Sequence, residues 1–269
     1  MPYIEKDSLE VYYEEYGDGE TIILLHHGFG CGKIWKAIYP HLVIHGHKVV
    51  VYDRRGFGKS DGGLDFDAFY ESDCYRSYSV EELNQLMDTL GIDQCHLIGQ
   101  CEGGVVAIDY AIRYPMRVKT LTAASTQCFS DVPMTTLNAR KFPRDFMSLE
   151  PALQAKMIEW HGEMAEVRYN KFAECGGAYG SGIFDLRQIL PLVDCPSLVL
   201  YPDRSSIFDV EQAISFYRHL SKGELAVFPR CGHNTYEQRP EDYIRTVLDF
   251  IARNTGEGIA RTPTSTCLA

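Results

Sequence analysis

The chain has 269 residues, of which 45% are hydrophobic and 23% charged, and its formal net charge is −11 at pH 7. This composition is typical of a globular protein with one large core, and the negative charge disfavours nucleic acids and anionic membrane surfaces as partners. No apolar run is long enough to span a bilayer, and residues 1–6 lack the pattern of a secretory signal, so we expect no membrane partner.

Nine cysteines are scattered along the chain, and none of them belongs to a Cys-x-x-Cys pair. This spacing predicts neither a disulfide scaffold nor a zinc site, and it favours a reducing, cytoplasmic location. We therefore expect no metal, and no motif predicts a cofactor. The sequence does not indicate an oligomeric state.

Strands and helices are predicted to alternate along most of the chain. Residues 9–16 favour a hairpin strand that ends at a glycine turn, and the apolar runs 21–26 and 48–52 predict buried strands. A helix over 79–90 is expected to begin with a capping box. The alternation predicts an α/β protein with a mainly parallel sheet and helices on both faces. The other expected elements are helices at 34–42, 105–111, 210–220 and 240–252, and strands at 96–98, 118–123, 197–201 and 224–228.

Residues 126–190 interrupt this alternation. The stretch is rich in methionine and aromatic residues, and residues 151–167 favour a helix. Most of its apolar side chains are expected to form a core of its own, but such an insertion between two strands is also typical of a lid. We therefore expect a core at 1–125 and 191–255, a helical lid at 126–190 and a frayed tail at 256–269.

The chemistry is predicted at a short turn, Gly-x-Cys-x-Gly, formed by residues 99–103. It follows an apolar strand and precedes an apolar helix, which is the setting of a nucleophile elbow with cysteine in the place of serine. Glycines flank the turn because the backbones pack closely there. A thiol at a helix amino terminus ionises more easily than an ordinary thiol. The alternative is a buried core thiol beside a glycine-rich turn.

Two further loops follow predicted strands. Residues 27–30, His-Gly-Phe-Gly, could supply the Phe29 N–H to an oxyanion hole, and the Glu102 N–H would supply the other donor. The alternative is a plain strand-to-helix turn. The second loop, residues 53–63, contains four glycines but lacks the lysine pattern of a phosphate-binding loop, so we interpret it as a structural turn.

Cys101, Asp203 and His233 each follow a predicted strand, in the chain order nucleophile, acid, base. With the loops at 27–30 and 53–60, these motifs resemble the α/β-hydrolase superfamily from about residue 10 to residue 253. The resemblance is to the lidded branch and implies an eight-stranded sheet.

The resemblance also implies an acyl-transfer enzyme. Cys101 would form a thioester with an ester, thioester, lactone or carrier-bound acyl substrate, His233 would act as base and then acid, and Asp203 would orient it. Thioesters react well with amines, thiols and carbon nucleophiles, so a cysteine nucleophile favours acyl transfer relative to simple hydrolysis. Asp209 is the next candidate for the acid. The candidates to line the pocket are Trp35, Trp160, His161 and Tyr169.

Two other functions remain open at this stage. The first is an enzyme that forms or breaks a C–C bond in a polyketide-like chain. The second is a small-molecule receptor that uses the hydrolase pocket for binding, although a receptor has no need of Asp203 and His233. Fold alone does not decide among these functions.

Overall fold

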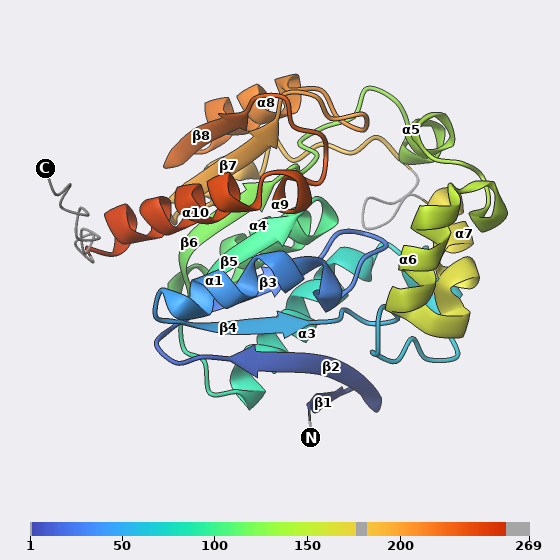
Figure 1. The fold of residues 1–269 in the computed structure, drawn as a ribbon, viewed down its shortest axis with the longest axis horizontal. Coiled ribbons are helices and arrows are strands. Elements are labelled where there is room, and N and C mark those ends of the chain that lie inside the picture. Colours follow the sequence, from blue (N-terminus) through green and yellow to red (C-terminus); the bar gives the residue numbers. More distant parts are fainter. Residues whose placement is uncertain (1, 176–181, 257–269) are drawn as a thin grey trace, which may run out of the picture.

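The computed structural model describes residues 2–175 and 182–256 of the chain. Its centre is an eight-stranded sheet in the order β1-β2-β4-β3-β5-β6-β7-β8 (Figure 1). β1 and β4 both pair antiparallel with β2, and the other five pairs are parallel. Of the tail predicted at 256–269, residues 257–269 lie outside the described residues. The strands are β1 (Tyr3–Lys6), β2 (Leu9–Tyr16), β3 (Glu20–Leu25), β4 (His47–Tyr52), β5 (Cys95–Gln100), β6 (Val118–Ala124), β7 (Ser197–Pro202) and β8 (Gly223–Phe228).

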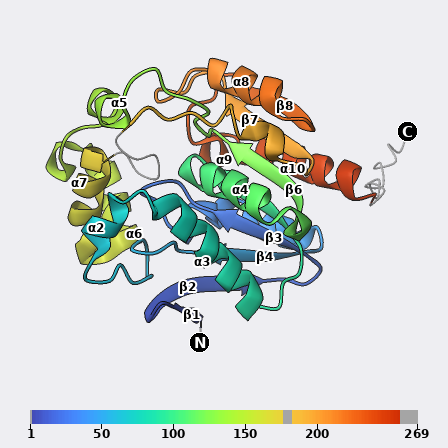
Figure 2. The same ribbon diagram turned by 180° about the vertical axis from the view of Figure 1, so that it is seen from behind.

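Helices cover both faces of the sheet, as the alternating pattern predicts. Helices α1 and α10 cover one face, and α3, α4 and α8 cover the other (Figures 1 and 2). Their apolar side chains form two hydrophobic cores against the sheet. No helix in the described part of the chain is long and apolar enough to cross a membrane. The helices are α1 (Tyr39–Ile44), α2 (Phe66–Tyr70), α3 (Tyr75–Thr89), α4 (Glu102–Arg113), α5 (Met134–Lys141), α6 (Pro151–His161), α7 (Ala165–Cys175), α8 (Glu211–His219), α9 (Thr235–Gln238) and α10 (Pro240–Thr255).

The segment between β6 and β7 forms α5, α6 and α7, which lie beyond the carboxyl ends of the central strands (Figure 1). The helix predicted over 151–167 is broken, because Gly162 has φ +58° and ends α6. Side chains of all three helices line the same pocket as Cys101. The segment is thus placed where it shapes the space above the elbow.

Two local predictions were wrong. The hairpin involves β1 and β2, which are joined at Asp7 and Ser8, and not the glycine turn after Tyr16. The predicted capping box is absent because α3 begins four residues earlier, at Tyr75. Ser79 therefore bonds to the Tyr75 carbonyl inside the helix, and Glu82 accepts from the Arg55 N–H. Burial raises the pKa of Glu82 to about 7.

Candidate active site

Cys101 occupies a strained turn between β5 and α4. Its φ of +51° and ψ of −114° lie in a region that side chains other than glycine rarely adopt, at a cost of about 1–3 kcal/mol. A Cβ atom on Gly103 would collide with the carbonyls of Leu25 and His26, so only glycine allows α4 to pack this closely on β3. The sharp turn predicted from the Gly-x-Cys-x-Gly pattern is therefore present.

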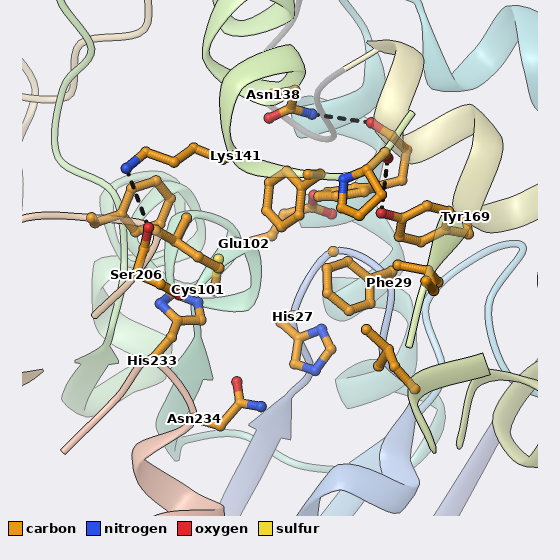
Figure 3. Close-up of a pocket in the computed structure, with 18 of the residues that line it drawn as sticks. His27, Phe29, Cys101, Glu102, Asn138, Lys141, Tyr169, Ser206, His233 and Asn234 are labelled. Carbon is orange, nitrogen blue, oxygen red and sulfur yellow. Dashed lines mark hydrogen bonds between the residues drawn. The ribbon is translucent and has the colours of Figure 1, made fainter. Parts of the chain in front are cut away.

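The turn presents Cys101 to a pocket of about 480 Å³. Figure 3 shows Cys101 beside His233 on one wall, with Phe29 and Tyr169 across the space from them. The Phe29 ring packs against Tyr169 and Phe172 at centroid distances of 6.2 Å and 4.9 Å. This pocket suits an apolar or aromatic group close to the thiol.

His233 is held through its backbone as well as its ring. Its carbonyl accepts hydrogen bonds from Gln100 Nε2 at 3.1 Å and from Ser125 Oγ at 2.8 Å, so the ends of β5 and β6 fix the position of the loop. Its ring packs edge-on against Phe208. Burial lowers the pKa of His233 to about 4, so the imidazole is neutral at pH 7.

The structure places Ser205, and not the expected Asp203, against the ring of His233. Ser205 Oγ lies 3.2 Å from Nδ1 of His233. The Asp203 carboxylate instead accepts the Cys231 N–H at 3.1 Å and pairs with Arg204 at 3.6 Å. The second candidate acid, Asp209, accepts the Glu211 N–H at the start of α8.

The reason for this difference lies in the path of the loop after β7. The strand ends at Pro202, and the side chain that follows turns back toward the loop after β8 instead of toward the pocket. Sequence reasoning took the first acidic residue after the strand and missed Ser205. A serine at this position carries no signal of its own, because its role depends on the direction of the turn.

Two of the four predicted pocket residues, Trp160 and Tyr169, line the pocket. The other two lie elsewhere. Trp35 is 0% exposed and packs against Tyr236 and Tyr243 in the core between the sheet and α10. His161 lies at the end of α6 and lines a second, smaller pocket together with Asp53 and Gly58.

His161 connects α6 to two loops of the core. The Gly58 N–H donates to its Nδ1 at 2.9 Å, so the ring proton is on Nε2, which donates to the Phe29 carbonyl at 2.9 Å. His161 thereby holds the loop whose N–H group is the expected oxyanion donor. Burial lowers the pKa of His161 to about 4, and protonation of Nδ1 would oppose the Gly58 N–H.

We expect this histidine to make the protein less stable in acid. Its pKa is lower in the folded state than the ordinary 6.5, so its contribution is complete above pH 6.5 and is lost as the pH falls toward 4. The loss for such a shift is roughly 3 kcal/mol. Urea unfolding of His161→Gln should therefore show a weaker pH dependence between 6.5 and 4 than the unsubstituted protein. His41→Gln, on the exposed side of α1, is the control and should leave the slope unchanged. Equal slopes for all three proteins would contradict this role.

An ion pair lies directly behind the elbow. Arg54 Nη1 donates to Glu102 Oε1 at 2.6 Å, and both side chains are 1% exposed. Tyr75 donates to the same oxygen at 3.0 Å, and Arg54 also donates to the carbonyls of His26 and His27. The loop after β4 is thus a structural element, as predicted, because it delivers the cation that balances the acidic residue after Cys101.

Within residues 2–175 and 182–256, no three histidine, cysteine or acidic side chains are grouped so that they could hold a metal ion. At the pocket, the thiol of Cys101 lies near the imidazole of His233, and the hydroxyl of Ser205 approaches that ring.

The sheet order, the helices on both faces and the cysteine at a strand-to-helix elbow define the α/β-hydrolase fold. A family model described as alpha/beta hydrolase fold matches residues 20–150. The chain is 22% identical to a 2-hydroxy-6-oxo-6-phenylhexa-2,4-dienoate hydrolase of Burkholderia cepacia, over 91% of this chain and 92% of that one.

Two further similarities extend over nearly the whole chain. A 2-hydroxy-6-oxononadienedioate/2-hydroxy-6-oxononatrienedioate hydrolase of Burkholderia vietnamiensis is 26% identical, with 91% of this chain and 92% of the relative covered. The structure of an enol-lactonase from Burkholderia xenovorans is 20% identical and superimposes with a TM-score of 0.75, covering 93% of this chain and 100% of that one. Such similarity supports the fold from the first strand to the last helix.

Proposed function

We propose that this protein is an enzyme that cleaves or transfers the acyl group of an ester, thioester or lactone through a thioester on Cys101. The observation that carries the proposal is the thiol held in a strained turn, at the edge of a pocket and beside a neutral imidazole. Strain of this kind persists where the surrounding structure imposes it, and it is concentrated at functional sites.

Each part of the pocket has a role in this proposal. The sulfur attacks the acyl carbon, and the electron pair of the carbonyl moves to its oxygen, where the N–H groups of Phe29 and Glu102 stabilise the charge. The bond to the leaving group then breaks and leaves a thioester. Water or another nucleophile then attacks the thioester carbon and loses its proton to solvent. The C–S bond breaks, and its electron pair leaves on the sulfur, which restores the thiolate. The aromatic side chains near Phe29 would hold the acyl chain.

Cysteine suits this site because the group that approaches Nδ1 of the histidine is the Ser205 hydroxyl. A serine nucleophile requires a base that an acid keeps in place, whereas a thiol is partly ionised near neutral pH and is the stronger nucleophile. A thiol therefore depends less on help from the histidine than a serine hydroxyl would. The cysteine at 101 and the serine against the histidine ring are thus consistent with each other.

C–C bond hydrolysis is the second candidate. Two relatives are named as hydrolases of 2-hydroxy-6-oxo dienoates, which are ketones without an ester, so their hydrolysis breaks a C–C bond. A ketone of this type would also leave its acyl part on Cys101. The two candidate functions differ in the leaving group, which departs on oxygen or sulfur from an ester, thioester or lactone and on carbon from a ketone.

We expect an acyl group to accumulate on Cys101 during turnover. The protein should be mixed with an aryl ester of a short aromatic acid, quenched in acid and measured by intact mass and peptide mapping. The experiment should be done in a Cys74→Ser background, because the thiol of Cys74 is exposed and could react without catalysis. The expected result is one added acyl group on the peptide that contains Cys101. Turnover without any adduct, or with an adduct elsewhere, would contradict the proposal.

A further inference from the structure

The oxygen of Ser205 has three polar neighbours. Besides its contact with Nδ1 of His233 at 3.2 Å, it accepts the N–H groups of Ile207 at 3.2 Å and Phe208 at 3.1 Å. A hydroxyl group has two lone pairs and one hydrogen. Because two backbone N–H groups occupy the lone pairs, the hydrogen is what remains for the histidine.

We propose that Ser205 is the positioning residue of His233 and fixes it as the neutral tautomer with the proton on Nε2. The hydroxyl donates to Nδ1, so Nδ1 is the acceptor and the other ring nitrogen carries the hydrogen. In a Ser-His-Asp triad the tautomer is the reverse, because the acid accepts from Nδ1–H and leaves Nε2 free to take a proton. In this protein His233 therefore presents a hydrogen-bond donor to the pocket.

The surroundings of His233 also oppose the imidazolium ion. That ion would need an acceptor at Nδ1, but both lone pairs of Ser205 are already engaged. The carboxylates of Asp203 and Asp209 are bound to other groups. Other titratable groups of the pocket lining are Cys101, His27, which burial keeps neutral by lowering its pKa, and Lys141, which donates to the Ser206 carbonyl. The Glu102 carboxylate is paired with Arg54. Burial lowers the pKa of His233, in agreement with this geometry.

This tautomer restricts the substrates, provided that the function proposed above is correct. The thiol must lose its proton to solvent, and the thiolate pair forms the new C–S bond. When the bond from the acyl carbon to the leaving group breaks, its pair stays on the leaving atom. A neutral imidazole can stabilise that atom with a hydrogen bond from Nε2, but it does not protonate it, because it is a far weaker acid than the imidazolium ion.

The substrates should therefore have leaving groups that are stable as anions. Thioesters, aryl esters, enol esters and enol lactones release a thiolate, a phenolate or an enolate, and these need no proton on departure. Alkyl esters and amides release strongly basic anions that need an acid. We therefore assign the site to thioesters, aryl esters, enol esters and enol lactones, and we exclude alkyl esters and amides as substrates.

The tautomer can be measured without any substrate. In protein labelled with ¹⁵N-histidine, the His233 resonances, assigned by their loss in His233→Gln, should show a protonated Nε2 and an unprotonated Nδ1 at pH 7. Ser205→Asp should reverse the tautomer, because a carboxylate can accept the two backbone N–H groups and Nδ1–H together. Asp203→Asn is the matched control on the same loop and should keep the original pattern. A protonated Nδ1 in the unsubstituted protein would overturn the inference.

A series of esters of one aromatic acid tests the substrate class. The acylation rate should rise steeply from ethyl to phenyl to p-nitrophenyl ester, and the ethyl ester should show no turnover above background. Ser205→Asp should accept the ethyl ester and should show a weaker dependence on the leaving group. Similar rates for ethyl and phenyl esters in the unsubstituted protein would overturn the inference. The expected tautomer without acylation by any ester would refute the proposed function and leave the role of Ser205 intact.

Discussion

Replacement of Cys101 by alanine should lower kcat/KM for an activated aryl ester by roughly 10⁴-fold or more, because the thioester cannot form. Cys101→Ser should be nearly as inactive. A hydroxyl needs a base to remove its proton, and His233 with its proton on Nε2 cannot accept one. The double variant Cys101→Ser with Ser205→Asp should regain much of the activity, since it restores a serine, histidine and carboxylate in their usual relation.

Stability measurements separate this chemical effect from unfolding. Cys101 has a positive φ, so Cys101→Gly should relieve backbone strain and be more stable than Cys101→Ala by about 1 kcal/mol. Both variants should be inactive although both fold, as judged by thermal unfolding. Full activity in Cys101→Ala would refute a covalent mechanism, and inactivity together with loss of folding would show that the thiol is structural.

Arg54→Met should destabilise the fold by about 3–5 kcal/mol, because it leaves the Glu102 carboxylate buried without its cation. Arg76→Met is the matched control. Arg76 pairs with Asp109 at 2.5 Å, but it is 31% exposed, and pairs of this kind contribute about 0–1 kcal/mol. Urea unfolding measures both variants.

The double variant Arg54→Met with Glu102→Gln should recover part of the loss, because no unpaired charge then remains in the core. A loss below about 1 kcal/mol for Arg54→Met would mean that water or another group compensates Glu102. An equal loss in the single and double variants would show that the packing of Arg54 matters more than its charge.

Much of the fold followed from local patterns in the sequence. Buried strands such as residues 197–202 are centred on short apolar runs, here residues 198–200, and the glycines at 99 and 103 have a steric function that one sequence reveals. The elbow was predictable because a single tight turn determines it. The position of His233 at the pocket was predictable, because it lies in the short loop after the last strand, at the carboxyl edge of the sheet.

The orienting group was not predictable because it depends on the path of a loop. Asp203 and Ser205 are two residues apart, and only the turn after Pro202 decides which side chain meets the ring. The prediction that Trp35 lines the pocket was wrong because a tryptophan is equally suited to a hydrophobic core, which is where Trp35 lies. The capping-box motif of Ser79 and Glu82 lies inside α3, so the same residue types can occur in a helix without capping its end.

The bond from His161 to the Phe29 carbonyl has a consequence for the way in which substrate enters. If α6 swings outward to admit a molecule, this bond must break, and the peptide that would stabilise the oxyanion loses its support. The protein could therefore not have an open entrance beneath α6 and a supported oxyanion site at the same moment. Entry from the side of α5, where Lys141 reaches the Ser206 carbonyl at the rim, avoids this conflict (Figure 3). The loop at residues 27–30 can then keep its bond to His161 throughout the reaction, while substrate and product pass on the side of α5.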